Sequence, residues 1–160
     1  MKRRAAFTLI ELLAVIAIIC ILAALIVGAS RYAWQKAATS RAQSEIAGME
    51  NALETYKSDN GAYPFSTIQR SDVSNNNTNL YSSLAGGSKI YFNFQSTQLR
   101  VQPGGTATNV LDPFGNPYNY FNPPPGSTDI KNNQATFDLW SFGPSGTDGA
   151  PDEITNWKQQ

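Results

Sequence analysis

The chain has 160 residues, which allows one small domain and one long accessory element but not two full domains. Its twelve Lys and Arg residues balance twelve Asp and Glu residues, so it lacks the basic surface that a dedicated nucleic-acid-binding protein needs. With no histidine and a single cysteine, Cys20, it cannot use Ser-His-Asp or Cys-His catalysis, histidine metal ligands or an intrachain disulfide, and we expect no enzyme and no nucleic-acid partner.

The N-terminal region is basic at first and then strongly apolar. Lys2, Arg3 and Arg4 precede a segment, residues 7–30, whose only charged residue is Glu11. The charge-free part, residues 12–30, would rise about 28 Å as a helix, close to the hydrocarbon thickness of a bilayer. A helix buried in a soluble domain is rarely so apolar on every face. The pattern therefore predicts a membrane segment followed by a polar domain.

Two ordinary explanations of this segment are open. A cleaved secretory signal would have the basic start, but its apolar run would be shorter and would end at a cleavage site of small residues. A signal anchor explains the length and, with the basic residues held in the cytoplasm, the orientation. Neither explains Glu11, because a carboxylate within an apolar membrane segment is costly without a partner.

The spacing around Glu11 suggests one partner. If the chain were cut between Ala6 and Phe7, the new ammonium group would lie four residues before Glu11, and helical residues four apart are neighbours. In an assembly, the carboxylate could instead meet the terminal ammonium of an adjacent subunit, which would set the register between copies. The alternative is that Glu11 lies at shallow depth and extends toward the lipid headgroups.

The basic start and the following residues together resemble a known family. Residues 2–6, K-R-R-A-A, followed by residues 7–13, F-T-L-I-E-L-L, are similar to the leader and the mature start of type IV pilins and pseudopilins. The resemblance implies that a prepilin peptidase removes residues 1–6, cutting between Ala6 and Phe7, and methylates the new amine of Phe7. It also implies that Glu11 directs subunits into a helical filament. Ala6 stands where the family almost always has Gly.

The helix is expected to continue beyond the apolar segment, over residues 31–59. This region has no proline, and its apolar residues recur at alternating spacings of four and three, which predicts one buried stripe that packs against the polar domain. The stripe consists of Ala42, Ile46, Met49, Leu53 and Tyr56. Asn60-Gly61 then supplies a C-cap, so the whole helix should span about 50 residues, or roughly 75 Å.

The remaining residues, 60–160, predict a small polar domain made of short elements. One or two helical turns are expected over residues 80–85, and a dense turn over residues 112–117. Alternating or aromatic segments predict strands, which should form one small antiparallel sheet on the amphipathic half of the helix. These segments are residues 90–94, 98–102, 118–121 and 136–141. The fold class expected from these elements is α+β, and the resemblance implies the type IV pilin fold.

Several segments of this domain resemble the major pseudopilins of type II secretion systems in particular. The helix exit, Y-K-S-D-N-G-A-Y-P, the turn D-P-F-G-N-P-Y and the strand F-D-L-W-S-F-G each have a counterpart in that family. So do residues 152–157 at the C-terminal end, whereas residues 66–110 have none. Disulfide-closed type IVa pilins fit less well, because the chain has no second cysteine.

The loop at residues 143–153 is the most promising ligand site. It places Asp148, Asp152 and Glu153 among several glycines, and Ca²⁺ takes six to eight oxygen ligands from such loops. The resemblance implies a calcium site with carboxylates from Asp148 and Asp152 and main-chain or hydroxyl oxygens from Leu139 and Ser141. Ser145 stands where the family usually has Asp, which would weaken binding. The alternative is a solvated turn whose Asp residues cap their own backbone.

The functional interpretation follows from these features. We expect a filament subunit that waits in the cell inner membrane as a single-pass precursor with a periplasmic C-terminal domain, in contact with lipid. After cleavage it would form a homopolymer in the periplasm, aided by an inner-membrane assembly platform and minor pseudopilins. A subunit of a surface type IV pilus or competence filament is the second interpretation, and a membrane-anchored enzyme is a third and weaker one.

Overall fold

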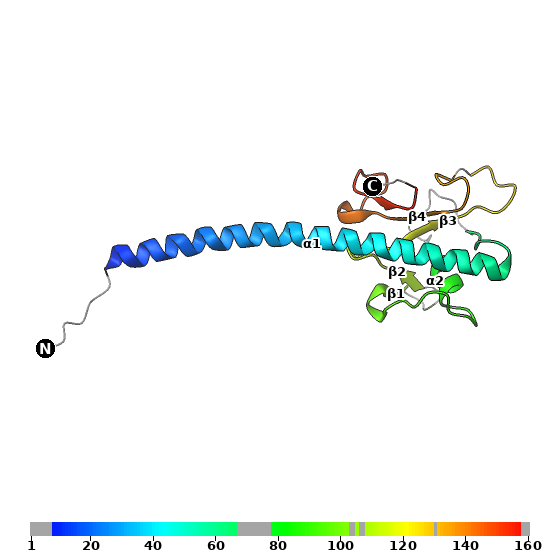
Figure 1. Ribbon diagram of the computed structural model, residues 1–160, viewed down its shortest axis with the longest axis horizontal. Helices are drawn as coiled ribbons and strands as arrows, with labels where there is room; N and C mark the ends of the chain where they lie inside the picture. Colours follow the sequence, from blue (N-terminus) through cyan, green and yellow to red (C-terminus); the bar gives the residue numbers. More distant parts are fainter. Residues whose placement is uncertain (1–7, 67–77, 103–104, 106–107, 130, 158–160) are drawn as a thin grey trace. The chain divides into compact units, whose positions relative to one another are not determined.

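The computed structural model describes residues 8–66, 78–102, 105, 108–129 and 131–157. Two compact units are present, Met1–Ala37 and Ala38–Gln160, and each is considered by itself. The long helix α1, Leu9–Asn60, contributes its first part to one unit and its second part to the other. Figure 1 shows α1 followed by the short elements of the second unit.

The predicted long helix is confirmed, together with its C-terminal end. α1 has 52 residues, and the backbone N–H of Gly61 donates to the carbonyl of Lys57 at 2.8 Å. Gly61 has a φ of +80°, the left-handed conformation that ends many helices and that glycine adopts without strain. The Asn-Gly pair therefore ends the helix in the way that its sequence predicts.

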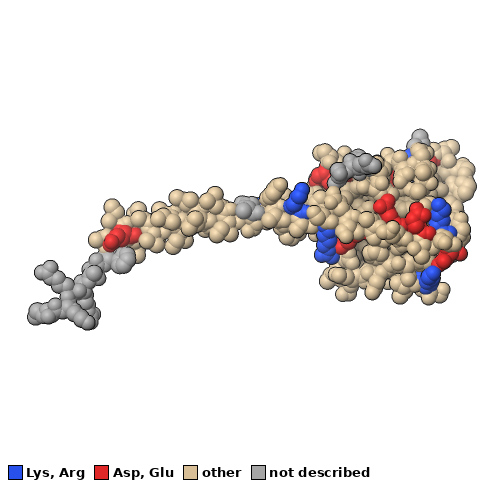
Figure 2. All heavy atoms as spheres, in the orientation of Figure 1, with Lys and Arg blue, Asp and Glu red and all other residues tan. Residues whose placement is uncertain are grey.

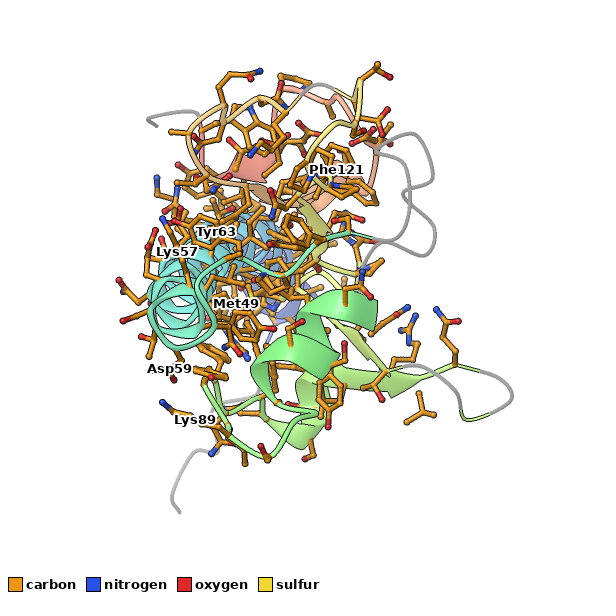
Figure 3. All side chains as sticks on the ribbon, turned by 90° about the vertical axis from the view of Figure 1, so that its right-hand side faces the viewer. Met49, Lys57, Asp59, Tyr63, Lys89 and Phe121 are labelled. Carbon is orange, nitrogen blue, oxygen red and sulfur yellow. The ribbon has the colours of Figure 1, made fainter. Side chains whose placement is uncertain are left out.

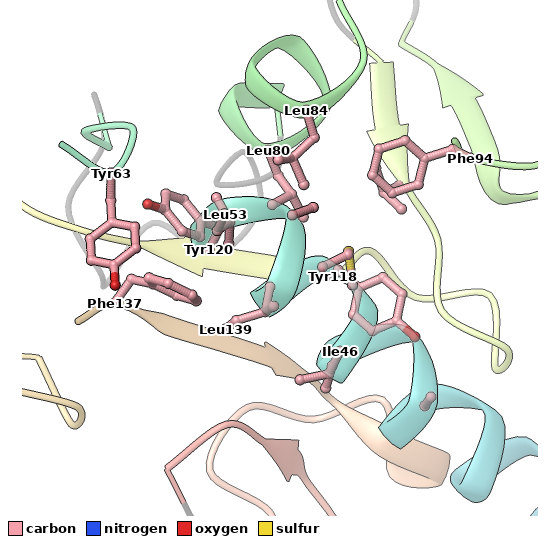
Figure 4. Packing of buried hydrophobic residues seen from close by; sticks show 14 of the residues in the cluster. Ile46, Leu53, Tyr63, Leu80, Leu84, Phe94, Tyr118, Tyr120, Phe137 and Leu139 are labelled. Carbon is pink, nitrogen blue, oxygen red and sulfur yellow. The ribbon is translucent and has the colours of Figure 1, made fainter. Parts of the chain in front are cut away.

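The buried stripe in the second half of α1 is also confirmed. Ala42, Ile46, Met49 and Leu53 are at most 4% exposed, and Tyr56 is half-buried at the end of the stripe. These side chains meet others from α2, Thr78–Leu84, and from the strands (Figure 4). Because such close-packed apolar contacts supply most of the stability of a small domain, this cluster is the core of the second unit.

The strands form two small antiparallel sheets instead of the single sheet predicted from the sequence. In the first, β1, Leu99–Val101, pairs with β2, Thr108–Val110. In the second, β4, Asp138–Ser141, is the central strand between β3, Asn119–Phe121, and β5, Ile154–Thr155. The predicted strands at 98–102, 118–121 and 136–141 are confirmed. The sequence does not predict β2 or β5, because Thr-Asn-Val and Ile-Thr show neither the alternation nor the aromatic residues that mark the other strands.

The strand predicted at residues 90–94 is wrong. The backbone N–H groups of Tyr91 and Phe92 both donate to the carbonyl of Leu84, at 2.8 and 3.1 Å, which folds this segment back onto the end of α2. Its aromatic rings pack individually, with Phe92 and Phe94 at 4.7 Å between ring centroids. The alternation in the sequence therefore reflects separate aromatic contacts and not the pleat of a sheet.

The exit from α1 is held by two polar clusters. The hydroxyl of Tyr63 donates to Glu54 at 2.5 Å, and the ammonium of Lys57 lies 4.4 Å from the centre of the Tyr63 ring. Burial, followed by the adjacent Glu54, raises the pKa of Tyr63 to about 12. At the last turn of α1, Lys89 donates to Asp59. Figure 3 labels Lys57 and Tyr63 of the first cluster and both residues of the second. These contacts fix the direction in which the chain leaves the helix.

Candidate functional site

The first part of α1 exposes apolar side chains around its circumference. From Leu9 to Ile26 its large apolar residues are between 50% and 82% exposed. Among the residues that the structure describes, α1 is the one helix long and apolar enough to cross a membrane. Figure 2 shows little charge along this stretch between an acidic group near its start and the first cations. So much apolar surface is not left in water, which means that lipid or other protein must cover it.

The single acidic residue of this segment is held at the start of the helix. Both the backbone N–H and the hydroxyl of Thr8 donate to the carboxylate of Glu11, at 2.8 and 2.7 Å. In return, the backbone N–H of Glu11 donates to the hydroxyl oxygen of Thr8 at 3.4 Å. This reciprocal pair is a capping box, in which residue N3 satisfies the N-cap N–H. Glu11 therefore has an intramolecular partner even before any second copy arrives.

Thr8 is one functional candidate that the sequence analysis did not single out. The pattern Thr8-x-x-Glu11 carries the S/T-x-x-E signature of a capping box, which could have been read directly from the sequence. The predicted cleavage position, Ala6 and Phe7, lies outside the described residues. The pairing of Glu11 with a terminal amine accordingly stays a prediction.

The two predicted carboxylate ligands of the calcium site have separate partners in the structure. Asp152 accepts hydrogen bonds from the backbone N–H and the hydroxyl of Ser145, at 2.8 and 2.9 Å. Asp148 accepts one from the indole N–H of Trp140 at 3.2 Å. The neighbouring Glu153 accepts one from the backbone N–H of Gly149 at 2.5 Å. Asp152 and Glu153 thus tie one part of the loop to another, and Asp148 ties the loop to β4.

The other two predicted ligands lie on β4, where both side chains are buried. The carbonyl of Leu139 accepts from the backbone N–H of Asn156 at 3.0 Å. The hydroxyl of Ser141 donates to Asp112 at 2.5 Å and accepts from the backbone N–H of Gly143 at 3.0 Å. Within the described residues no group of three or more acidic, histidine or cysteine side chains converges on one point. All four predicted ligands have hydrogen-bond partners that a cation would have to replace or share.

Asp112 is a second residue that the sequence analysis did not single out. It is 5% exposed, and its carboxylate accepts from the backbone N–H groups of Phe114 and Asn116, at 2.9 and 2.8 Å, as well as from Ser141. Burial raises its pKa, although these hydrogen bonds oppose the shift. It joins the turn at residues 112–117 to β4 and so positions the start of the loop.

One concavity lies on the surface of the second unit. It has a volume of about 330 Å³ and is lined by four polar residues, Gln43, Glu50, Thr155 and Asn156, together with Ile46, Ala47 and Ile154. Burial raises the pKa of Glu50. Glu50 is the one ionisable group in this lining, so the lining holds no pair of groups for general acid–base chemistry.

Comparison with known proteins agrees with this combination of a capped apolar helix and a small α+β domain. Residues 1–27 match the family model for the prokaryotic N-terminal methylation motif, which places the chain in the class of proteins that carry this motif. Over 98% of its length the chain is 33% identical to the type II secretion system core protein G of Aeromonas hydrophila, of which it covers 94%. It is 34% identical to the protein of the same name from Escherichia coli K12, and this match covers 94% of this chain and 89% of the relative. The chain belongs to the type II secretion system core protein G family.

A solved structure shows a weaker similarity. The major pseudopilin from the type 2 secretion system of enterohaemorrhagic Escherichia coli gives a TM-score of 0.43 at 24% identity, covering 76% of this chain and 88% of that one. The family assignment rests on the sequence relatives alone.

Proposed function

We propose that this chain is a structural subunit that polymerises with identical copies into a periplasmic pseudopilus, the filament that drives type II protein secretion. The observation that carries the proposal is the exposure of apolar side chains on all sides of α1 from Leu9 to Ile26. Packed against the same segment of neighbouring copies, this surface would form an apolar filament core. The family relatives, named as core components of type II secretion, support this role over that of an enzyme.

The precursor is proposed to sit in the inner membrane before assembly. Lys2, Arg3 and Arg4 would stay in the cytoplasm according to the positive-inside rule, leaving the C-terminal domain in the periplasm after one membrane crossing. Prepilin peptidase would cut between Ala6 and Phe7 and methylate Phe7, as the matched methylation motif supports. The assembly platform and minor pseudopilins are the further partners expected for this role.

Glu11 would act at two stages of assembly. In the single subunit, Thr8 supplies two hydrogen bonds to its carboxylate, which lowers the cost of holding the charge near lipid. In the filament, the terminal amine of a neighbour would replace or supplement them, because an ionic partner is stronger than a neutral one in an apolar surrounding. A pair of this kind fixes the register between subunits.

Replacing the carboxylate tests the proposal. We expect Glu11→Leu to be cleaved and methylated at Phe7 but to form few or no filaments, as seen by electron microscopy and by mass analysis of the N-terminus. Asp129→Asn, which alters an exposed acidic group of the polar domain, is the matched control and should assemble normally. The proposed filament function would be contradicted if Glu11→Leu formed normal filaments or if the purified wild type retained Met1.

We also propose that the loop at residues 143–153 binds Ca²⁺ weakly. The donor set fits a hard cation, because it consists of the carboxylates of Asp148 and Asp152 with oxygens from Leu139 and Ser141. Binding would have to exchange the Trp140 and Ser145 hydrogen bonds for coordination. Because these bonds must be given up and Ser145 stands where the family usually has Asp, the expected dissociation constant lies in the range of weak extracellular sites, about 10⁻⁴–10⁻³ M.

A chelation experiment decides the question. For the full-length protein in mild detergent, Ca²⁺ should raise the melting temperature and change the tryptophan fluorescence, because Asp148 contacts the Trp140 indole. Asp148→Asn and Asp152→Asn should abolish both responses, whereas Asp129→Asn should keep them. Identical melting curves for the wild type in excess Ca²⁺ and in chelator would rule out the site.

A further inference from the structure

Two exposed aromatic side chains mark the end of the apolar half of α1. Tyr32 is 72% exposed and Trp34 58% exposed, and Phe65 is the only other large aromatic among the exposed apolar residues of the described chain. In the second unit, by contrast, Tyr118, Tyr120 and Trp140 are completely buried. Two of the three exposed aromatic residues therefore lie within three positions of each other, directly after the charge-free segment.

We propose that Tyr32 and Trp34, together with Arg31 and Lys36, form an anchor that binds phospholipid headgroups on the periplasmic side of the membrane in the unassembled subunit. This inference rests on the proposed membrane-inserted precursor. It adds that these four residues determine how deeply the helix sits in the bilayer. The occupant of the surface is a lipid interface that contains anionic headgroups.

The length of the helix places the anchor at the correct depth. Residues 12–30 rise about 28 Å, which matches the hydrocarbon core of a bilayer. From Thr8 to Trp34 the rise is about 39 Å, close to the thickness of a bilayer with its headgroup regions included. When the capping box of Thr8 and Glu11 lies at one interface, Trp34 therefore reaches the other.

The residue types at this position match the chemistry of the interface. Tyr and Trp have an apolar ring and a polar edge, and they concentrate where hydrocarbon meets headgroups. On a helix, Arg31 and Trp34 are three residues apart and Tyr32 and Lys36 are four apart, so each ring has a cation beside it. Arg31 and Lys36 are exposed, and the side chains of Arg and Lys form charge-assisted hydrogen bonds with phosphate groups. One ring and one cation, Trp34 and Arg31, thus share one face of the helix, and Tyr32 and Lys36 share the opposite face.

The depth of Trp34 provides the direct test. The full-length chain is reconstituted in vesicles of phosphatidylethanolamine and phosphatidylglycerol, with lipids brominated either near the headgroup or near the chain end. The contribution of Trp34 is the fluorescence of the wild type minus that of Trp34→Phe. We expect blue-shifted emission with stronger quenching by the shallow bromines. Stronger quenching by the deep bromines, or quenching by aqueous acrylamide alone, would overturn the anchor.

A second measurement separates an anchor from a contact between subunits. Cys20 is the single cysteine and is exposed, so a fluorescent label on it reports the position of the helix in the bilayer. Tyr32→Ala with Trp34→Ala should shift the depth of this label, whereas Tyr32→Phe with Trp34→Phe should shift it less. Unchanged depth together with lost filament assembly would assign these residues to subunit packing and overturn the proposal. If the wild type fails to float with the vesicles, the membrane placement itself is wrong.

Discussion

The two parts of α1 have the same backbone geometry but opposite environments. From Leu9 to Ile26 the large apolar side chains are exposed, whereas Ala42, Ile46, Met49 and Leu53 are buried against the rest of the second unit. The first part is apolar on every face, and the second is apolar on one stripe with charged residues elsewhere. The distribution of apolar residues around α1 therefore determines what covers them. A single apolar stripe packs against the same chain, whereas apolar residues on every face require lipid or another protein.

The sharpest test of this contrast is a matched pair of leucine substitutions. Leu53→Ala should destabilise the second unit by about 3–4 kcal/mol, because it removes a completely buried side chain and leaves a cavity. Leu22→Ala, at a position 54% exposed, should leave the same unfolding transition unchanged. Guanidinium unfolding of the full chain in mild detergent measures both. Equal effects would mean that the two halves are stabilised in the same way.

Alanine substitutions at two glycines of the second unit compare a turn crowded by neighbouring atoms with an open one. At Gly143, with a φ of +68°, a Cβ would lie 2.1 Å from the carbonyl oxygen of Asp152, so Gly143→Ala should cost about 2–3 kcal/mol. At Gly61, with a φ of +80° but no neighbouring atom within 4 Å, Gly61→Ala should cost about 1 kcal/mol. Thermal unfolding compares the two variants, and a larger loss for Gly61→Ala would contradict the structure.

The buried Asp112 should make the stability of the second unit depend on pH. Its pKa is raised in the folded protein, so the native state holds the proton more tightly than the unfolded state, whose pKa is 3.8. The contribution to stability is therefore largest below pH 3.8 and is lost as the pH rises through the raised value. Asp112→Asn removes this dependence. The free energy of unfolding of Asp112→Asn minus that of the wild type should increase between acidic and neutral pH. If this difference stays constant, the pKa of Asp112 is not raised in the folded protein.

The smallest effect is expected at the surface ion pair near the end of α1. Lys89 and Asp59 are both exposed, and each holds the pKa of the other away from its usual value, downward for Asp59 and upward for Lys89. Since exposed ion pairs contribute little and are screened by salt, Lys89→Gln should change the melting temperature slightly at low salt and less at high salt. A large effect that persists in high salt would indicate that the Lys89 stem packs on Tyr91, whose ring centre lies 5.0 Å from its ammonium.

Much of the architecture could be predicted from local patterns. The 3.6-residue period and the Asn-Gly pair predict α1 and its C-terminal end, and the Asp-Pro-Phe-Gly segment predicts the turn before β3. The failures concern short elements. Residues 90–94 alternate like a strand but anchor separate aromatic contacts. The segments of β2 and β5, Thr-Asn-Val and Ile-Thr, show neither alternation nor aromatic residues, and they become strands only through pairing with β1 and β4.

The candidate sites divide in the same way. Glu11 stands out in the sequence because it is the one charge in an apolar segment, and its partner Thr8 could have been recognised by spacing. Asp112 could not, because its role depends on Ser141, which is 29 residues away in the chain. The partners of Asp148 and Asp152 likewise depend on how the loop folds back on itself.

The sequence by itself determined the long helix, the division into an apolar and an amphipathic half, and membership of the core protein G family. These features depend on periodicity, capping residues and composition, which act between neighbours in the chain. Only the tertiary structure decided that the described strands form two sheets, that Asp112 is buried, and that Ser145 and Trp140 bind the loop carboxylates. Those contacts join residues that are distant or irregularly spaced in the chain, and their geometry follows from packing around the shared core.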